Sequence, residues 1–238
     1  MRFGHHFYNW DRAWENDLDL RLRLTKETGW EGFEDKPHRI GAPPELVKDK
    51  CETMGIACVA IGGGIKEAID YAYAAGAGIA RSGVSKEECD RWVQYAGERG
   101  VIITMHNHLS VRNRGKGAVE TREDLLRYLD ERPGIYACPD TGHLLLCGSD
   151  PIQTIRDLGE RCAYIHLKDI DPEAVGKADK GGDSFWDLGT GALDLPGVME
   201  ALEVIGFDGW VMVERDGRVD DYVQSARNMR QALHDLGY

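Results

Sequence analysis

The chain has 238 residues and is 42% hydrophobic, so it can bury a full core as a single domain covering residues 1–238. Its formal net charge of −12 argues against nucleic acid or an anionic membrane as a partner, because proteins that bind either usually present a basic face. It has no apolar run of membrane-spanning length and no apolar signal segment near Met1, which predicts a cytoplasmic protein.

Six cysteines are scattered along the chain without a CxxC pair. This pattern favours reduced, half-buried thiols over a disulfide framework or a zinc knuckle. The cysteines are Cys51, Cys58, Cys89, Cys138, Cys147 and Cys162.

Strand-like and helix-like segments alternate about eight times along the chain. The expected strands cover residues 2–8, 32–34, 56–61, 78–81, 101–105, 135–138, 163–167 and 210–214. The expected helices cover residues 17–28, 43–55, 66–75, 85–100, 121–131, 150–161, 196–206 and 220–236. Start signals support two of the helices, a Ser-Lys-Glu-Glu capping pattern at Ser85 and an Asp-Pro pair at Asp150.

This rhythm predicts an α/β fold, a closed (β/α)8 TIM barrel, because the repeated strands do not alternate between apolar and polar residues. An open doubly wound sheet would be expected to carry a GxGxxG phosphate loop, and the Gly-Gly-Gly run at Gly62 does not match that motif. The longest stretch without periodicity covers residues 171–194, and a loop of this length often forms a lid or a substrate wall. Its Phe185-Trp186 pair could cap a sugar ring, with Trp186 in contact with substrate, or could simply pack the loop onto the barrel.

Metal-binding side chains lie at the ends of four consecutive expected strands. They are His106, Asp140, His166 and Glu214. Carboxylate and imidazole together suit Mn²⁺, Mg²⁺, Co²⁺ or Zn²⁺, and the lack of a thiolate points away from a structural zinc. A strand-end Asp can be a mere helix cap and a lone His a core residue. Four such residues at equivalent positions are harder to place by chance, so the sequence predicts one divalent metal site.

The same segments resemble the xylose isomerase-like TIM-barrel superfamily, in particular its sugar phosphate isomerase/epimerase group, which includes ketose 3-epimerases, hydroxypyruvate isomerase and inosose dehydratase. The motifs that carry the resemblance are M-H-N-H-L-S, C-P-D-T-G-H, Y-I-H-L-K-D, D-L-G-T-G and G-F-D-G-W-V-M-V-E-R-D. They lie between residues 101 and 216. The first hundred residues match only in rhythm and in the G-W-E-G-F-E segment at residues 29–34.

The resemblance implies a metal, with Mn²⁺ as the expected ion, held by Glu, Asp, His and Glu from successive strands. Asp140, His166 and Glu214 match the last three ligands, whereas His106 stands where the family has its first glutamate. In ketose epimerases the two glutamates also move the proton, so this departure puts a two-base epimerase mechanism in doubt. The H-x-H form resembles inosose dehydratases, in which case His106 or His108 could transfer a proton or bind substrate.

Roles for the remaining polar residues follow from chemistry and position. A bound metal would act as a Lewis acid, Glu214 or a histidine would take a proton from carbon, and His143 would hold or protonate a substrate oxygen. Lys168 could polarise a carbonyl or pair with Asp169. The expected catalytic residues are Glu214, His106, His143 and Lys168, and the expected substrate-binding residues are Glu34, His108, His5, Trp186 and Arg215. Glu34 could instead be an exposed loop acid. His5 and His6 could line the pocket mouth, or their pairing could be incidental. Arg215 and Asp216 could orient Glu214 instead of touching substrate.

The expected reaction is isomerisation or epimerisation of a keto-sugar or related polyol through an enediolate. The alternative is a lyase or dehydratase that eliminates a β-hydroxyl or alkoxy group from a keto-sugar, keto-glycoside or inosose. A phosphodiesterase like endonuclease IV would need more metal ligands and a basic groove, which the acidic charge disfavours. A non-catalytic sugar-binding module is the other class. The expected partner is a small sugar, with a homo-oligomer possible.

Overall fold

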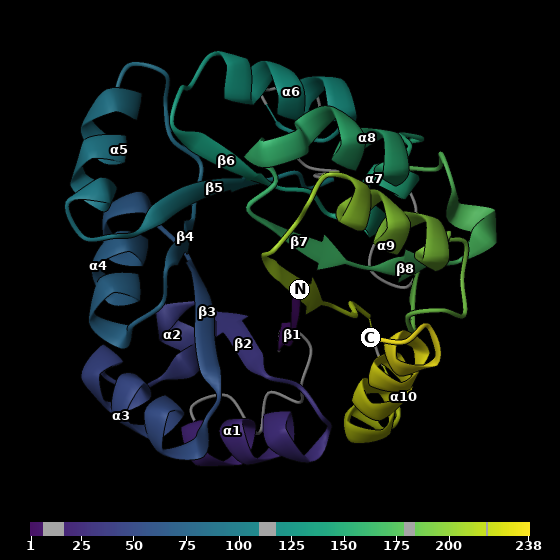
Figure 1. The fold of residues 1–238 in the computed structure, drawn as a ribbon, viewed down its shortest axis with the longest axis horizontal. Coiled ribbons are helices and arrows are strands. Elements are labelled where there is room, and N and C mark those ends of the chain that lie inside the picture. Colours follow the sequence, from purple (N-terminus) through teal and green to yellow (C-terminus); the bar gives the residue numbers. More distant parts are fainter. Residues whose placement is uncertain (7–16, 110–117, 179–183, 218) are drawn as a thin grey trace.

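The computed structural model describes all residues except 7–16, 110–117, 179–183 and 218. Eight parallel strands form a single sheet that curves into a barrel inside a ring of helices (Figure 1). The strands are β1 (Arg2–His6), β2 (Gly32–Asp35), β3 (Ala57–Gly62), β4 (Ile79–Arg81), β5 (Ile102–His106), β6 (Ile135–Cys138), β7 (Tyr164–Leu167) and β10 (Trp210–Val213). The predicted (β/α)8 barrel is therefore confirmed.

The sheet runs β6-β5-β4-β3-β2-β1-β10-β7, so β6 and β7 meet where the barrel closes. These two strands share two isolated parallel bridges, Ala137 with Cys162 and Asp140 with His166. Two backbone hydrogen bonds accompany the bridges, from Ala163 N to Ala137 O (3.1 Å) and from His166 N to Pro139 O (3.0 Å). The closing seam thus ends at two of the predicted metal ligands.

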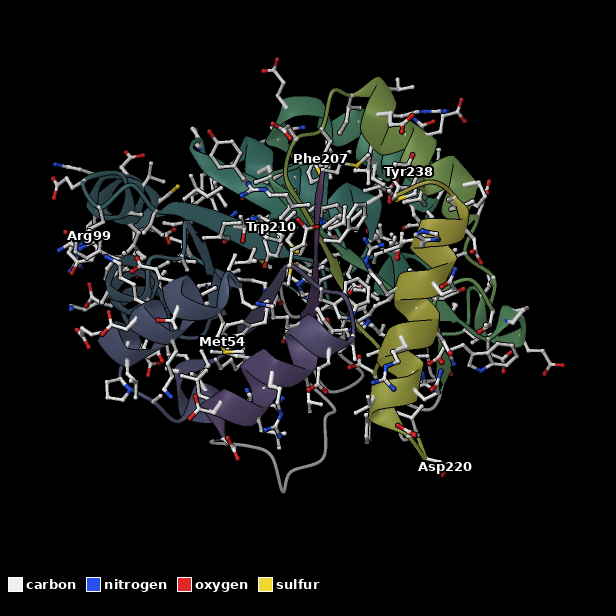
Figure 2. The ribbon with its side chains drawn as sticks, turned by 60° about the horizontal axis from the view of Figure 1, so that its bottom comes forward. Met54, Arg99, Phe207, Trp210, Asp220 and Tyr238 are labelled. Carbon is white, nitrogen blue, oxygen red and sulfur yellow. The ribbon has the colours of Figure 1, made fainter. Side chains whose placement is uncertain are left out.

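The helices lie outside the barrel. They are α1 (Leu18–Glu27), α2 (Pro37–Ile40), α3 (Pro44–Met54), α4 (Ile65–Ala75), α5 (Cys89–Gly97), α6 (Arg122–Asp130), α7 (Thr141–Leu146), α8 (Pro151–Leu158), α9 (Leu195–Val204) and α10 (Tyr222–Asp235). Helix α10 lies between Asp220 and Tyr238, which are labelled beyond its two ends in Figure 2. From this helix Arg230 Nε donates to Gly29 O, just past the end of α1, at 3.0 Å. No helix in the described part of the chain is both long and apolar enough to cross a membrane.

Two apolar clusters pack against the strands, one outside the sheet and one inside the barrel. The larger one packs helices against the outside of the sheet, with residues such as Val47, Ile69 and Leu125 fully buried. The smaller one comprises Val59, Ala60, Ile79, Cys138, Tyr164, Trp210 and Met212. Apart from the neighbours Val59 and Ala60, beside the irregular register of the β2–β3 pair, its members alternate along the strands with those of the outer core, so they fill the barrel interior. Polar side chains are left to gather at the carboxyl ends of the strands.

Most predicted boundaries agree with the structure within a few residues, but one helix begins later than predicted and some short elements were not predicted. Helix α5 begins at Cys89, because the Ser85 hydroxyl lies 3.4 Å from the Glu88 side chain instead of capping a free backbone N–H at the expected helix start. The short helices α2 and α7 were not predicted. Neither was the antiparallel pair β8 (Asp169–Ile170) and β9 (Phe185–Trp186), which is formed across a long loop. Residues 7 and 8 of the expected first strand lie outside the described part of the chain.

Candidate metal centre and active site

The predicted metal ligands meet at the carboxyl end of the barrel. His106, Asp140 and His166 each offer one ligand atom, and these three atoms lie within 4.8 Å of one another. His106 Nε2 is 3.0 Å from Asp140 Oδ2, and His166 Nδ1 is 3.7 Å from the same oxygen. Glu214, just past β10, adds its Oε2 at 2.9 Å from His166 Nδ1. Three strands therefore supply ligand atoms that lie close together, and Glu214 from a fourth strand joins them beside His166.

The local fold leaves one oxygen of Asp140 available for an ion. Asp140 caps α7, and its Oδ1 accepts a hydrogen bond from His143 N at 3.0 Å. Its backbone N–H donates to Asn107 Oδ1 at 2.8 Å, which ties the residue to the end of β5. Capping occupies Oδ1, so Oδ2 can face the cluster. Asp140 thus caps α7 with Oδ1 and could bind an ion with Oδ2.

The donor set fits a divalent ion. His166 is fully buried, yet neither of its ring nitrogens makes a hydrogen bond to a described residue, although acceptor oxygens lie at 2.7 and 2.9 Å. Burial opposes the charged forms of Asp140 and Glu214, but nearby positive groups, Lys168 foremost for Asp140 and His6 for Glu214, hold the pKa of both carboxyls well below the usual range. Two ionised carboxylates and two imidazoles form the mixed oxygen and nitrogen set that Mn²⁺ or Zn²⁺ accepts.

Lys168 lies within this cluster, fully buried. Its Nζ is 2.7 Å from Asp216, 3.2 Å from Glu214 and 3.4 Å from Asp140. Burial alone would lower the pKa of Lys168, but these carboxylates, Asp140 first, raise it above the ordinary value. The alternative of a pair with Asp169 is wrong, because the Asp169 carboxylate accepts backbone N–H groups from the following loop instead.

Two further histidines, His108 and His143, lie beside the candidate ligand His106. The rings of His108 and His143 lie 4.1 Å apart between centroids, and His106 lies 6.0 Å from His143. Neither nitrogen of His143 has a hydrogen-bond partner among the described residues. Burial lowers the pKa of His143 to about 3, so its imidazole is neutral at physiological pH. A neutral imidazole with both nitrogens unused is suited to bind a substrate hydroxyl.

A second polar group lies at the ends of β1, β2 and β4. Glu34 Oε1 is 2.7 Å from His166 Nε2, 3.2 Å from His6 Nε2 and 3.4 Å from Arg81 Nη2. Burial favours the protonated form of Glu34, but His166, Arg81 and His6 bring its pKa down to about 2. Glu34 is therefore a buried, ionised carboxylate in contact with a metal-ligand histidine, and the reading as an exposed loop acid is wrong.

The sequence placed His6 only together with His5 at the pocket mouth, and it did not single out Arg81. The structure places His6 beside the cluster, with Nδ1 at 3.8 Å from Glu214 Oε1, whereas the neighbouring His5 stacks on Trp30 at 5.6 Å between ring centroids. The signal that could have distinguished them is strand phase, since successive side chains of a strand point to opposite faces. Arg81 is the last residue of a three-residue strand, which offers little pattern to read.

The long loop after β7 packs against the site. Phe185 is buried, with its ring edge-on to His143 at 5.3 Å between centroids, whereas Trp186 is 38% exposed. Arg215 Nε donates to Asp187 Oδ1 at 3.2 Å, which ties the end of β10 to this loop. Phe185 thus packs the loop onto the barrel, while substrate contacts of Trp186 and Arg215 stay predictions.

The fold and site define a TIM-barrel protein with a candidate divalent-metal site at the carboxyl ends of its strands. Residues 22–232 match the family described as xylose isomerase-like TIM barrel, and the chain belongs to that family.

Curated relatives resemble part of the chain. An inosose dehydratase from Clostridium botulinum (strain Alaska E43 / Type E3) is 31% identical over 133 residues, which cover 52% of this chain and 43% of the relative. One from Geobacillus thermodenitrificans is 29% identical over 153 residues, covering 59% of this chain and 49% of the relative. The chain thus spans less than half the length of the curated relatives that it matches.

Solved structures share the whole fold at low sequence identity. The IOLI protein with a bound zinc atom is similar with a TM-score of 0.79 and 17% identity, and the match covers 99% of this chain and 98% of that one.

Proposed function

We propose that the protein is a divalent-metal-dependent lyase that removes water from a keto-polyol or keto-sugar through the enediolate of the substrate. The observation that carries this proposal is the ligand cluster, in which His106 occupies the β5 position beside Asp140 and His166. With a histidine there, Glu214 is the one glutamate among the four candidate ligands, since the other carboxylate, Asp140, also caps α7. The similarity to inosose dehydratases supports elimination as the outcome.

The metal would be held by His106, Asp140, His166 and Glu214. A bound divalent ion supplies Lewis-acid chemistry, since it polarises a carbonyl and stabilises the negative charge that develops on its oxygen. Lys168 adds a buried positive charge next to Asp140 and Glu214. This lysine would lower the energy of an anionic substrate oxygen without changing its own protonation.

Glu214 would take the proton from the carbon next to the carbonyl. Its lowered pKa keeps it ionised and thus able to accept a proton. The same proton can then pass to the β-hydroxyl as the C–O bond breaks, so that water leaves and Glu214 returns to its starting form. His143 would hydrogen-bond the departing hydroxyl through its neutral imidazole. One base suffices for this sequence, whereas epimerisation needs a proton donor on the opposite face of the substrate.

Isomerisation or epimerisation is the second candidate function. Glu34 favours it, because this second carboxylate is buried and ionised within the same site. A D-psicose 3-epimerase from Clostridium cellulolyticum H10 also shares the fold, with a TM-score of 0.75, 15% identity and a match over 100% of this chain and 99% of that one. Return of the proton to the neighbouring carbon would give an isomerase.

A mass measurement distinguishes the two candidates. The Mn²⁺-loaded protein is incubated in D₂O with inososes and a panel of keto-sugars, and the products are analysed by mass spectrometry. The lyase proposal predicts products lighter by one water molecule, and their formation should stop when a chelator removes the ion. Deuterium gained at carbon without loss of water would favour the isomerase or epimerase. Neither change in any substrate would overturn both proposals.

A further inference from the structure

Arg81 projects into the mouth of the barrel from the end of β4. Ile79, two residues earlier on the same strand, belongs to the apolar barrel interior, so Arg81 faces the same way one step nearer the mouth. Its side chain remains 15% exposed. Gly62 on β3 makes room for it, since a Cβ at that position would lie 3.0 Å from Arg81 Nη2.

The guanidinium of Arg81 is only partly used by the protein. Its contacts with Glu34 Oε1 (3.4 Å) and His6 Nε2 (3.3 Å) both involve Nη2. Its Nε is buried and makes no hydrogen bond to any residue that the structure describes. A structural arginine usually binds a carboxylate through two parallel hydrogen bonds. Here the Glu34 oxygen that Arg81 contacts is also in contact with His166. Arg81 therefore keeps donors for another acceptor.

Lys36 brings a second positive charge to the same place. Its Cγ would lie 3.5 Å from a Cβ at Gly62, the point that Arg81 Nη2 also approaches. Burial, followed by the positive charges of Arg81 and Arg39, lowers the pKa of Lys36. Its ammonium group makes no ion pair or hydrogen bond to a described residue. Two cations that raise each other's energy are expected where an anion binds.

We propose that Arg81, backed by Lys36, forms an anion subsite that receives a carboxylate or phosphate substituent of the keto-sugar. The subsite lies at the β2 to β4 side of the mouth, across the barrel from β7 (Figure 1). The inference rests on the proposed function, because that function assigns the keto group to the metal. It narrows the substrate class from keto-sugars in general to acidic or phosphorylated ones.

Binding of matched ligand pairs tests the subsite independently of turnover. Calorimetry on the Mn²⁺-loaded protein compares D-fructose with D-fructose 6-phosphate, and D-fructose with D-fructuronate. The expected result is that at least one anionic ligand binds about tenfold or more tightly than its neutral partner, the effect of a charge-assisted hydrogen bond. The pair that shows the larger ratio identifies phosphate or carboxylate as the group received.

Variants locate the effect. Arg81→Met should bring the anionic preference close to one, and Arg81→Lys should keep part of it because the charge remains but the planar fork is lost. Lys36→Met should lower the preference without disturbing Glu34, so it tests the proposal even if Arg81→Met fails to fold. Arg91→Met is the matched control, since Arg91 is 71% exposed on α5 and should leave the ratio unchanged.

Two outcomes would overturn the subsite. One is equal affinity for neutral and anionic ligands in the unmodified protein. The other is an anionic preference that survives Arg81→Met but disappears in metal-free protein, since the anion would then bind the ion itself. If instead the lyase proposal is wrong, no substrate will lose water, while the affinity ratio and its dependence on Arg81 will persist.

Discussion

At the level of single residues, the proposed choice of elimination over epimerisation depends on His106. It lies 3.0 Å from Asp140 and stands where the resemblance places a glutamate. We predict that His106→Glu retains the metal and increases deuterium exchange at the substrate carbon without loss of water, because a second carboxylate base is restored. His108→Glu should not have this effect. Loss of the ion from His106→Glu would instead mean that the histidine is needed for coordination.

Glu34 would act on a bound metal through His166. Its Oε1 lies 2.7 Å from His166 Nε2, which leaves Nδ1 toward Asp140 and Glu214. A carboxylate on the far nitrogen of a ligating histidine fixes the ring and makes it a better ligand. We predict that Glu34→Gln weakens Mn²⁺ binding about 10- to 100-fold, as measured by competition with a chromophoric chelator. Glu45→Gln, at an exposed position on α3, is the control.

If Glu34 contacts only the substrate, Glu34→Gln will raise the KM while the metal affinity stays unchanged. Partial recovery of metal affinity in Glu34→Asp, which keeps the charge on a shorter side chain, would support the positioning role over a general loss of packing.

The convergence of the candidate metal ligands could be predicted from the sequence because each lies at or just past the end of an apolar strand, within a recognisable motif. The partners on β1 and β4 could not. His5 and His6 are adjacent identical residues, and a shift of one residue in strand phase exchanges their faces. Arg81 ends a strand of three residues, where no alternation can be read. Contacts such as Glu34 with His166 join residues far apart in sequence and depend on how the barrel closes.

At the level of elements, the loop after β7 is held by one buried carboxylate. Asp169 accepts hydrogen bonds from the backbone N–H groups of Gly189 and Gly191, and of Leu193, at 2.8 to 3.0 Å. Gly191 has to be glycine, because a Cβ there would lie 2.2 Å from Ile170 O. This D-L-G-T-G turn positions Phe185 against His143. The D-L-G-T-G motif could be recognised in the sequence, but its hydrogen bonds to Asp169 could not be predicted from it.

We predict that Asp169→Ala lowers the free energy of unfolding by about 3 kcal/mol, because several buried N–H groups lose their acceptor together. Chemical denaturation measures this directly, and the same variant should weaken substrate binding as Phe185 loses its support. Asp171→Ala, which removes only the cap of a short helical turn, should cost about 1 kcal/mol. Equal effects for the two variants would contradict an anchoring role for Asp169.

Short elements mark the limit of prediction from local sequence. Helix α7 has six residues and begins at the metal ligand Asp140, so its T-G-H-L-L-L segment reads as a turn followed by an apolar run. The strands β8 and β9 have two residues each and pair across more than a dozen intervening residues. Tertiary contacts rather than propensity stabilise such elements. Longer helices such as α6, with its capping box at Thr121, were predicted almost to the residue.

Buried histidines make the stability of the whole molecule depend on pH. Burial lowers the pKa of His5 and His143 from 6.5 to about 3, so in this range the unfolded chain binds more protons than the folded one. The free energy of unfolding of metal-free protein should therefore decrease as pH falls from 6.5 toward 3, by at most about 1.4 kcal/mol per pH unit for each group. Urea titrations at several pH values measure this slope. His5→Phe, which keeps a ring on Trp30, should reduce it, and an unchanged slope would contradict the assignment.

The seam between β6 and β7 links the metal to the stability of the whole barrel. Within the described chain these strands are joined by isolated bridges, and one of them pairs Asp140 with His166. An ion bound by both residues would hold the seam closed. Saturating Mn²⁺ at 100 times its Kd should add about 2.7 kcal/mol of stability, or about 5 to 10 °C in Tm. Amide hydrogen exchange shows which strands the ion stabilises.

The amides of Ala163 and His166, which cross the seam, should gain the most protection from exchange when Mn²⁺ binds. The amide of Ala57, which bonds Glu31 O near the β2–β3 pair on the other side of the barrel, should gain less. Asp140→Asn should abolish both the Tm shift and the local protection, because it removes a ligand while keeping an oxygen to cap α7. Protection that rises equally in all strands would mean that the ion stabilises the barrel without closing this seam.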